Sequence, residues 1–216
     1  IDGGANIGLS SIYMARAHPR SRIIAFEPDP QLAAYCRRNF AAAGVHNVEL
    51  REAALWTEAT ACRFQPDGAD GGHLLNGDQS PADPAEPADP ADPTVLTDRP
   101  QPIDVPAVRL ADVLDEVAGP LGFLKLDIEG AETAVLRDCA DHLANVEQLF
   151  VEYHSFPDRP QTLDALLAVL RGSGFRLHLV PENYAPQPLL SRPLQGGMDF
   201  QVNVFAVRET PPCTAC

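Results

Sequence analysis

The sequence lacks any apolar run near the roughly 18 residues that a membrane-spanning helix needs, so no such helix is predicted. Basic residues are also few, with 16 Lys and Arg against 30 Asp and Glu and a formal net charge of −14 at pH 7. Nucleic acids and anionic membranes are contacted through Lys and Arg, so this balance disfavours both as partners. We interpret the acidic composition as a solvated surface.

Cysteine is scarce and does not form a secreted disulfide framework, because the five residues are odd in number and widely spaced. Cys36, Cys62 and Cys139 lie in or beside predicted elements and are expected to be small core residues. Cys213 and Cys216 form a C-x-x-C near the end of the chain, without the second pair or nearby His that a zinc site requires. We expect a cytoplasmic protein.

The most informative motif is the glycine-rich stretch at residues 1–8 (IDGGANIG), followed by Glu27 nineteen residues after Gly8. A glycine turn, a helix and a strand ending in an acid are typical of an α/β sheet that holds an adenosine-containing cofactor. The acid is placed to accept hydrogen bonds from the ribose hydroxyls. A Gly-x-Gly-x-x-Gly turn is absent, and Asp2 stands at the mouth of the turn. A carboxylate there suits S-adenosylmethionine, which carries a positive charge and no phosphate, better than NAD.

Strands and helices alternate along the chain, which predicts a mostly parallel sheet with helices on both faces and an antiparallel edge strand. Helices are predicted at 9–17, 30–43, 110–118, 130–143 and 161–171, and strands at 22–27, 47–55, 61–64, 103–109, 122–128, 147–153, 175–180 and 199–207. Ligands of such sheets bind beyond the carboxyl ends of the strands, where acidic residues recur.

The length of 216 residues allows one α/β domain, which we place at 1–208 with a tail at 209–216. The glycine turn comes so early that we expect an N-terminally truncated domain. Residues 66–102 contain a loose Pro-Ala-Asp repeat that forbids helix and central strand, so we predict a flexible insertion there.

The stretches IDGGANIGLSSIYMA, AFEPDP, NVELREAALW, FLKLDIEGAE and LFVEYH occur in this order. In these stretches the chain resembles the FkbM family of S-adenosylmethionine-dependent methyltransferases. The resemblance implies the Rossmann-like sheet of class I methyltransferases and methyl transfer to an oxygen of a small molecule, such as a natural product or a sugar-containing metabolite. The family is broad, so the acceptor itself does not follow from it.

The resemblance also implies cofactor-binding residues. Asp2 and the turn Gly3, Gly4, Ala5 and Asn6 would line the methionine part, Gly8 would let the first helix pack closely on the sheet, and Glu27 would hold the ribose. Glu52 and Ala53 follow the third strand, where such enzymes contact the adenine. Asp127 ends the fourth strand beside the methyl group and is assigned to the acceptor side.

Methylation of a hydroxyl also needs a group that removes the proton. The predicted catalytic residues are Asp127, Glu129 and His154, and His154 is the preferred base because an unperturbed pKa near 6.5 suits neutral pH. We expect it to follow a buried strand and to lie at the mouth of the crevice, although a purely structural role is an alternative. Glu132 and Glu152 are further candidates.

The same acids together with His154 could instead bind Mg²⁺ or Mn²⁺. We do not favour a metal, because Glu132 is also explained by the dipole at a helix start and Glu129 by helix capping.

Two other functions stay open. An NAD-dependent oxidoreductase would need the absent Gly-x-Gly-x-x-Gly turn, and a non-catalytic cofactor-binding scaffold would bind without turnover. The acceptor pocket is expected from the loops at 155–160 and 181–198 and from the missing N-terminus. The sequence does not indicate the oligomeric state.

Overall fold

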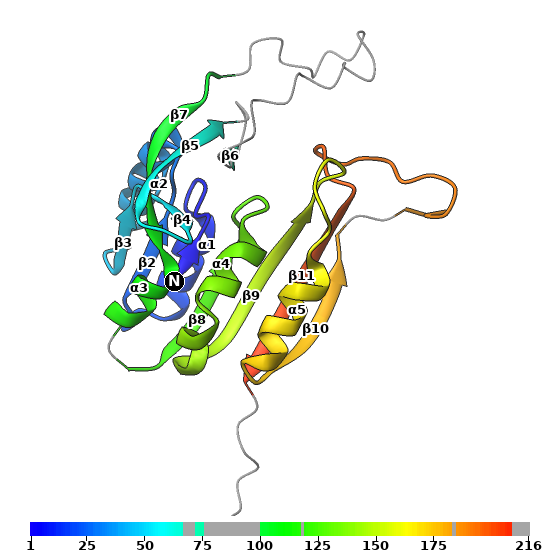
Figure 1. Cartoon of the computed structure of the whole chain (residues 1–216). Helices are drawn as coiled ribbons and strands as arrows, with labels where there is room; N and C mark the ends of the chain where they lie inside the picture. The colour runs from blue at the N-terminus through cyan, green and yellow to red at the C-terminus, as the bar shows by residue number, and fades with distance from the viewer. Residues whose placement is uncertain (67–71, 76–99, 118, 183–184, 209–216) are drawn as a thin grey trace, which may run out of the picture. The chain divides into compact units, whose positions relative to one another are not determined.

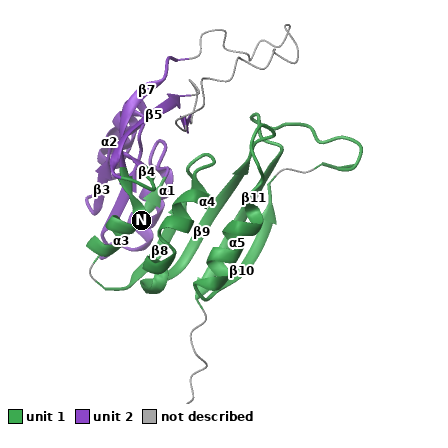
Figure 2. Cartoon of the chain, in the orientation of Figure 1, with its two compact units in different colours: residues 1–3, 55–58, 108–216 green, residues 4–54, 59–107 purple. Residues whose placement is uncertain are grey.

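The computed structural model describes residues 1–66, 72–75, 100–117, 119–182 and 185–208 (Figure 1). The chain divides into two compact units, shown in different colours in Figure 2. Unit 1 comprises residues 1–3, 55–58 and 108–216, and unit 2 comprises residues 4–54 and 59–107.

Unit 1 contains five strands of the main sheet in the order β10-β11-β9-β8-β1. Its elements are β1 (Asp2–Gly3), α3 (Leu110–Glu116), β8 (Leu121–Leu126), α4 (Glu132–Asp138), the 3₁₀ helix η1 (Ala140–Asn145), β9 (Val146–Ser155), α5 (Leu163–Gly172), β10 (Phe175–Pro181) and β11 (Phe200–Arg208). β1, β8 and β9 pair in parallel, and β11 runs antiparallel to both β9 and β10. The predicted antiparallel strand is present as β11, but it lies one place in from the edge, which is formed by β10.

The core of unit 1 lies between these strands and the helices that pack on them. Leu124, Leu126 and Val151 of the central strands are fully buried, as are Val135 of α4 and Leu166 of α5. In Figure 1, α4 and α5 lie on the same face of the unit 1 strands. Each such side chain contributes about 1.5–3 kcal/mol when it is removed from water.

Unit 2 pairs β2 with β3 in parallel and carries a separate antiparallel ladder. Its elements are α1 (Leu9–Ala17), β2 (Ile23–Phe26), α2 (Pro30–Ala43), β3 (Val48–Arg51), β5 (Thr60–Pro66), β6 (Gly72–Leu75) and residues 103–107 of β7 (Ile103–Arg109). Strand β4 (Ala54–Trp56) has its first residue in unit 2 and its other two in unit 1. β5 pairs with β6 on one side and with β7 on the other.

Helix α2 has the bounds that local signals predict. The side chain of Asp29 accepts hydrogen bonds from the backbone N–H groups of Gln31 and Leu32, and Pro30 occupies the first turn. Gly44 ends the helix with a left-handed φ of 64°. The helix buries Leu32, Cys36 and Phe40 along one side.

Two predicted elements are each divided in the structure. The strand predicted at 47–55 is broken between β3 and β4, where the N–H of Ala53 donates to the carbonyl of Arg51 and turns the chain. The helix predicted at 130–143 ends at Asp138, and the chain continues as η1 with a hydrogen bond from the His142 N–H to the Cys139 carbonyl.

Within the described residues of the predicted insertion at 66–102, β6 forms a strand. Residues 67–71 and 76–99 of the insertion, together with the tail 209–216 that holds Cys213 and Cys216, lie outside the described residues. Within the described part of the chain, no helix combines the length and apolarity that crossing a bilayer requires.

Candidate active site

The glycine turn of residues 4–8 has the backbone geometry that its sequence predicts. Gly4 and Gly8 adopt φ angles of 77° and 87°, and Asn6 is one of two described non-glycine residues with a positive φ. The N–H groups of Gly4 and Ala5 both donate to the carbonyl of Phe26, at 3.1 and 2.9 Å. These two hydrogen bonds hold the turn against the end of β2.

Glu27 follows β2 and holds this turn through its carboxylate. Oε2 accepts a hydrogen bond of 2.8 Å from the N–H of Asn6, and Oε1 accepts one of 2.9 Å from the N–H of Asp29. The residue is only 4% exposed.

Gly8 is required by close packing between helices. A Cβ at this position would lie 2.5 Å from Cε1 of Phe40 and 3.4 Å from the sulfur of Cys36, both on α2. The close approach at Gly8 was expected against the sheet, but the nearest side chains belong to α2. Cys36 itself donates to the carbonyl of Asn6.

The two residues predicted to contact adenine have different surroundings. Ala53 is buried at 6% exposure, whereas the Glu52 side chain is 45% exposed and forms an ion pair with Arg37 of α2. Any role of Glu52 toward a nucleobase would compete with this pair.

In unit 1 the structure brings the three predicted catalytic residues together. Nε2 of His154 lies 3.8 Å from Oδ1 of Asp127, 3.8 Å from Oε2 of Glu129 and 3.8 Å from Oε1 of Glu152. Asp127 and Glu129 follow β8, and Glu152 and His154 lie on β9. Because β8 and β9 are parallel, their carboxyl ends meet at one edge of the sheet.

The expected position of His154 at the crevice mouth is corrected by the structure. β9 extends through Ser155, so His154 lies inside the strand and is 5% exposed. Its Nδ1 is hydrogen-bonded at 2.9 Å to Oε1 of Glu132, a carboxylate that is 1% exposed. The imidazole is therefore held in one orientation, with Nε2 toward the other three acids.

Glu132 also organises the loop after β8. The same Oε1 accepts hydrogen bonds from the N–H groups of Ile128 and Gly130, at 3.2 and 2.9 Å. Between them stands Glu129, with a left-handed φ of 55°, which is a costly conformation for a side chain with a Cβ. Glu132 thus stabilises the backbone that presents Glu129.

Burial and the neighbouring carboxylates shift the titration of this cluster. Burial lowers the pKa of His154, but the hydrogen bond and charge of Glu132, with Glu129 and Asp127, outweigh it and raise the pKa to about 9. The imidazole is therefore a cation at neutral pH, which corrects the expectation of a free base with a pKa near 6.5. Burial, partly opposed by His154, raises the pKa of Glu129 to about 7.

Lys125 links the start of the chain to this cluster, and the sequence analysis did not single it out. Its Nζ lies 3.5 Å from Oδ1 of Asp2 and 3.1 Å from Oδ2 of Asp127. Asp2 is fully buried on β1, directly beside β8. The available signal was a lysine within the apolar strand FLKLDI, since a buried ammonium group requires an acidic partner.

The geometry also bears on a metal ion. Asp127, Glu152 and His154 each offer a ligand atom, and these atoms lie within 4.8 Å of one another. A protonated imidazole cannot ligate, however, and it already places a positive charge among the carboxylates. The donor set therefore fits a cation only after His154 loses its proton.

Comparisons with known proteins agree with the motifs. The profile of the family described as "Methyltransferase FkbM domain" matches residues 2–177. Methyltransferase 1 of Beauveria bassiana (strain ARSEF 2860) is 30% identical over 194 residues, covering 88% of this chain and 76% of that protein. The 31-O-demethyl-FK506 methyltransferase FkbM of Streptomyces tacrolimicus is 31% identical over 195 residues, covering 81% and 71%. The 2-O-methyltransferase NoeI of Sinorhizobium fredii (strain NBRC 101917 / NGR234) is 26% identical over 158 residues, covering 71% and 62%.

Solved structures with a similar arrangement include the precorrin-6y C5,15-methyltransferase of Geobacter metallireducens GS-15. It is 15% identical with a TM-score of 0.48, covering 96% of this chain and 78% of that one. The family match over residues 2–177 and the relatives at 30% identity and above decide the assignment. The chain therefore belongs to the FkbM family of S-adenosylmethionine-dependent methyltransferases.

Proposed function

We propose that the chain transfers a methyl group to a hydroxyl of a small molecule and that Glu129 is the general base. The observation that carries this proposal is the cluster at the carboxyl ends of β8 and β9. There a carboxyl with a pKa of about 7 lies 3.8 Å from an imidazolium that is held by a buried acid. A base whose pKa is near the working pH is the most efficient.

Each residue of the cluster has a different part in proton removal. The S-adenosylmethionine sulfonium supplies an electrophilic methyl carbon. As the acceptor oxygen bonds to that carbon, the carbon–sulfur bond would break and S-adenosylhomocysteine would leave as a neutral thioether, while Glu129 would take the proton of the acceptor hydroxyl on its carboxylate. His154 stays protonated, and its charge offsets the negative charge of Asp127 and Glu152. Glu132 positions both His154 and the loop that carries Glu129.

For the cofactor, the chain offers donors and acceptors that suit an adenosyl group with a positive sulfonium. Glu27, whose carboxylate binds the backbone of the glycine turn at Asn6, would hold the ribose hydroxyls. Asp2 and the turn from Gly3 to Asn6, with Gly8, would accommodate the methionine part, and Glu52 and Ala53 would contact the adenine. A positive ligand also suits the acidic Asp2 better than a pyrophosphate would.

A small-molecule acceptor is supported by the names of two relatives. One is a 31-O-demethyl-FK506 methyltransferase and another is a 2-O-methyltransferase. The net charge of −14 further favours such an acceptor over nucleic acid. We also propose a cytoplasmic location, because the cysteine pattern does not resemble a secreted disulfide framework.

The proposal is tested by titration calorimetry with S-adenosylmethionine and with NAD, followed by a turnover assay. Turnover is measured as release of S-adenosylhomocysteine in the presence of hydroxylated test acceptors such as phenyl β-D-glucoside. Glu129→Gln should retain cofactor affinity and lose about 10²–10⁴-fold in kcat. The matched control is Glu147→Gln, an exposed acid on β9.

The alternatives predict different results. A scaffold would bind S-adenosylmethionine with no turnover of any acceptor, and an oxidoreductase would bind NAD instead. A metal-dependent enzyme would lose activity in EDTA and regain it with Mg²⁺ or Mn²⁺, whereas acid–base catalysis by Glu129 is unaffected by the chelator. An unchanged kcat in Glu129→Gln would refute the assignment of the base.

A further inference from the structure

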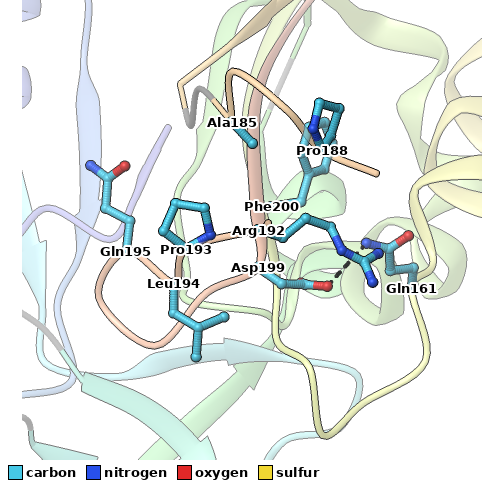
Figure 3. A pocket seen from close by; sticks show the side chains of 9 residues that line it. All are labelled: Gln161, Ala185, Pro188, Arg192, Pro193, Leu194, Gln195, Asp199 and Phe200. Atoms are coloured by element: carbon cyan, nitrogen blue, oxygen red, sulfur yellow. Dashed lines mark hydrogen bonds between the residues drawn. The ribbon is translucent and has the colours of Figure 1, made fainter. Parts of the chain in front are cut away.

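Unit 1 contains an open pocket with a volume of about 610 Å³ (Figure 3). Its lining combines apolar side chains with polar ones and includes Gln161, Pro188, Arg192, Leu194, Asp199 and Phe200. Ligand sites of drug-sized molecules span about 300–1,000 Å³ and show this mixture. The pocket therefore has room for a hydroxylated metabolite of moderate size.

The segment 155–161 joins this pocket to the cluster around His154. Ser155 follows His154 directly, and its hydroxyl donates to Oδ1 of Asp199 at 2.7 Å. A Cβ on Gly130, next to Glu129, would lie 3.0 Å from the ring of Phe156. The segment thus contacts the base loop near its start and reaches the pocket at Gln161 near its end.

The pocket's two charged residues are not equivalent. Both oxygens of Asp199 already accept hydrogen bonds, from the Ser155 hydroxyl and, at 3.4 Å, from the Gln161 amide. Arg192 forms no ion pair or hydrogen bond with any residue that the structure describes. Its planar guanidinium matches the geometry of a carboxylate or phosphate, with two parallel hydrogen bonds.

Apart from Gln195, the remaining lining is apolar, and it comes largely from the loop between β10 and β11. Pro188, Leu194 and Phe200 line the same pocket as Arg192 (Figure 3). An apolar group of a ligand placed there would lose water on one side and leave its charged group beside Arg192. Contact with apolar walls also strengthens an ionic hydrogen bond by excluding water.

We propose that this pocket binds the part of the methyl acceptor remote from the reacting hydroxyl, and that the acceptor carries an anionic group, a carboxylate or phosphate, recognised by Arg192. The inference rests on the proposed function, because it assigns the acceptor side of that reaction. It makes Arg192 a specificity-determining residue, with Leu194 and Phe200 as the apolar part of the site.

The test uses three probes that share a phenyl glycoside and differ in one group: phenyl β-D-glucoside, phenyl β-D-glucuronide and phenyl β-D-glucoside 6-phosphate. Dissociation constants are measured by calorimetry with the full chain saturated with S-adenosylhomocysteine. At least one anionic probe should bind about tenfold more tightly than the neutral glucoside, as expected for a charge-assisted pair in a half-open site. Comparison of the two anionic probes distinguishes a carboxylate from a phosphate ligand.

Variants separate charge from packing. Arg192→Gln should abolish the preference for the anionic probe, and Arg192→Lys should restore part of it. Leu194→Ser should weaken all three probes alike. Arg171→Gln, a charge-matched change at an exposed position of α5, should alter nothing.

Equal affinity for the three probes, binding of none of them, or an unaltered preference in Arg192→Gln overturns the proposal. Failure of the proposed function is seen separately, as absent S-adenosylmethionine binding or absent turnover. Intact turnover of neutral acceptors with no anion preference would refute only the role of Arg192.

Discussion

Replacing Glu132 by glutamine should destabilise the protein in a manner that depends on pH. The carboxylate is 1% exposed and accepts three hydrogen bonds, one of them from His154. Glutamine keeps the shape and one acceptor oxygen but removes the charge. The variant therefore isolates the contribution of the buried ion pair between Glu132 and His154.

The size of the effect follows from the titration of His154. Because each pKa unit corresponds to about 1.4 kcal/mol, a rise from 6.5 to about 9 corresponds to about 3 kcal/mol of folding free energy. The stabilisation that results from a raised folded-state pKa is fully present below the unfolded pKa of 6.5. It is lost as the pH rises through the folded-state pKa of about 9. Since Glu132 is the largest cause that raises this pKa, Glu132→Gln should cost about 2 kcal/mol at pH 6 and under about 1 kcal/mol at pH 10.

The assay is urea unfolding at pH 6 and pH 10, followed by circular dichroism. The chain supplies a matched control in His142 and Asp115, whose Nδ1 and Oδ1 lie 2.8 Å apart, with side chains that are 29% and 66% exposed. Asp115→Asn should cost less than about 1 kcal/mol, because exposed ion pairs are screened by water. A cost for Glu132→Gln that is the same at both pH values, or no larger than that of Asp115→Asn, would show that the buried pair does not carry this energy.

Three further outcomes are expected. Gly8→Ala should lower the free energy of unfolding by about 3 kcal/mol, because a Cβ would meet Phe40 at 2.5 Å with φ at 87°. Gly44→Ala should cost only about 1 kcal/mol, because φ is 64° but no atom lies within 4 Å of the added Cβ. Equal losses of stability for the two variants in urea unfolding would contradict the packing argument. The pH profile of kcat/KM should rise through about 7 as Glu129 ionises and fall through about 9 as His154 loses its proton; a rate that does not change between pH 6 and 8 would argue against Glu129. Glu27→Ala should weaken S-adenosylmethionine binding in calorimetry and also lower stability by about 1–3 kcal/mol for each N–H left unbonded; wild-type affinity would remove Glu27 from the cofactor site.

Elements with strong local signals were predictable in type and in bounds. Pro30 and Gly44 are present at the two ends of α2, and the observed helix has the predicted range of 30–43. The break between β3 and β4 was not predictable, because Glu52 and Ala53 are not turn-forming residue types. There a backbone hydrogen bond, rather than a side-chain preference, turns the chain.

Some parts of the candidate site were likewise predictable from local sequence, and others were not. The family, the methyl donor and the acids at the strand ends followed from contiguous motifs, because the glycine turn and the DIEG segment are local features. Lys125 and Arg192 were missed, since their importance depends on Asp2 and on the loop between β10 and β11.

Residue types and their spacing predicted an α/β sheet with a site for an adenosine-containing cofactor, and the resemblance to the FkbM family added methyl transfer. The sequence named Asp127, Glu129 and His154 as candidates but did not show how their pKa values differ. A pKa depends on burial and on charges within a few ångströms, and Glu132 reaches His154 from 22 positions away in the sequence. Only the parallel pairing of β8 with β9 and the placement of α4 give His154 a raised pKa, and on that basis we propose Glu129 as the proton acceptor.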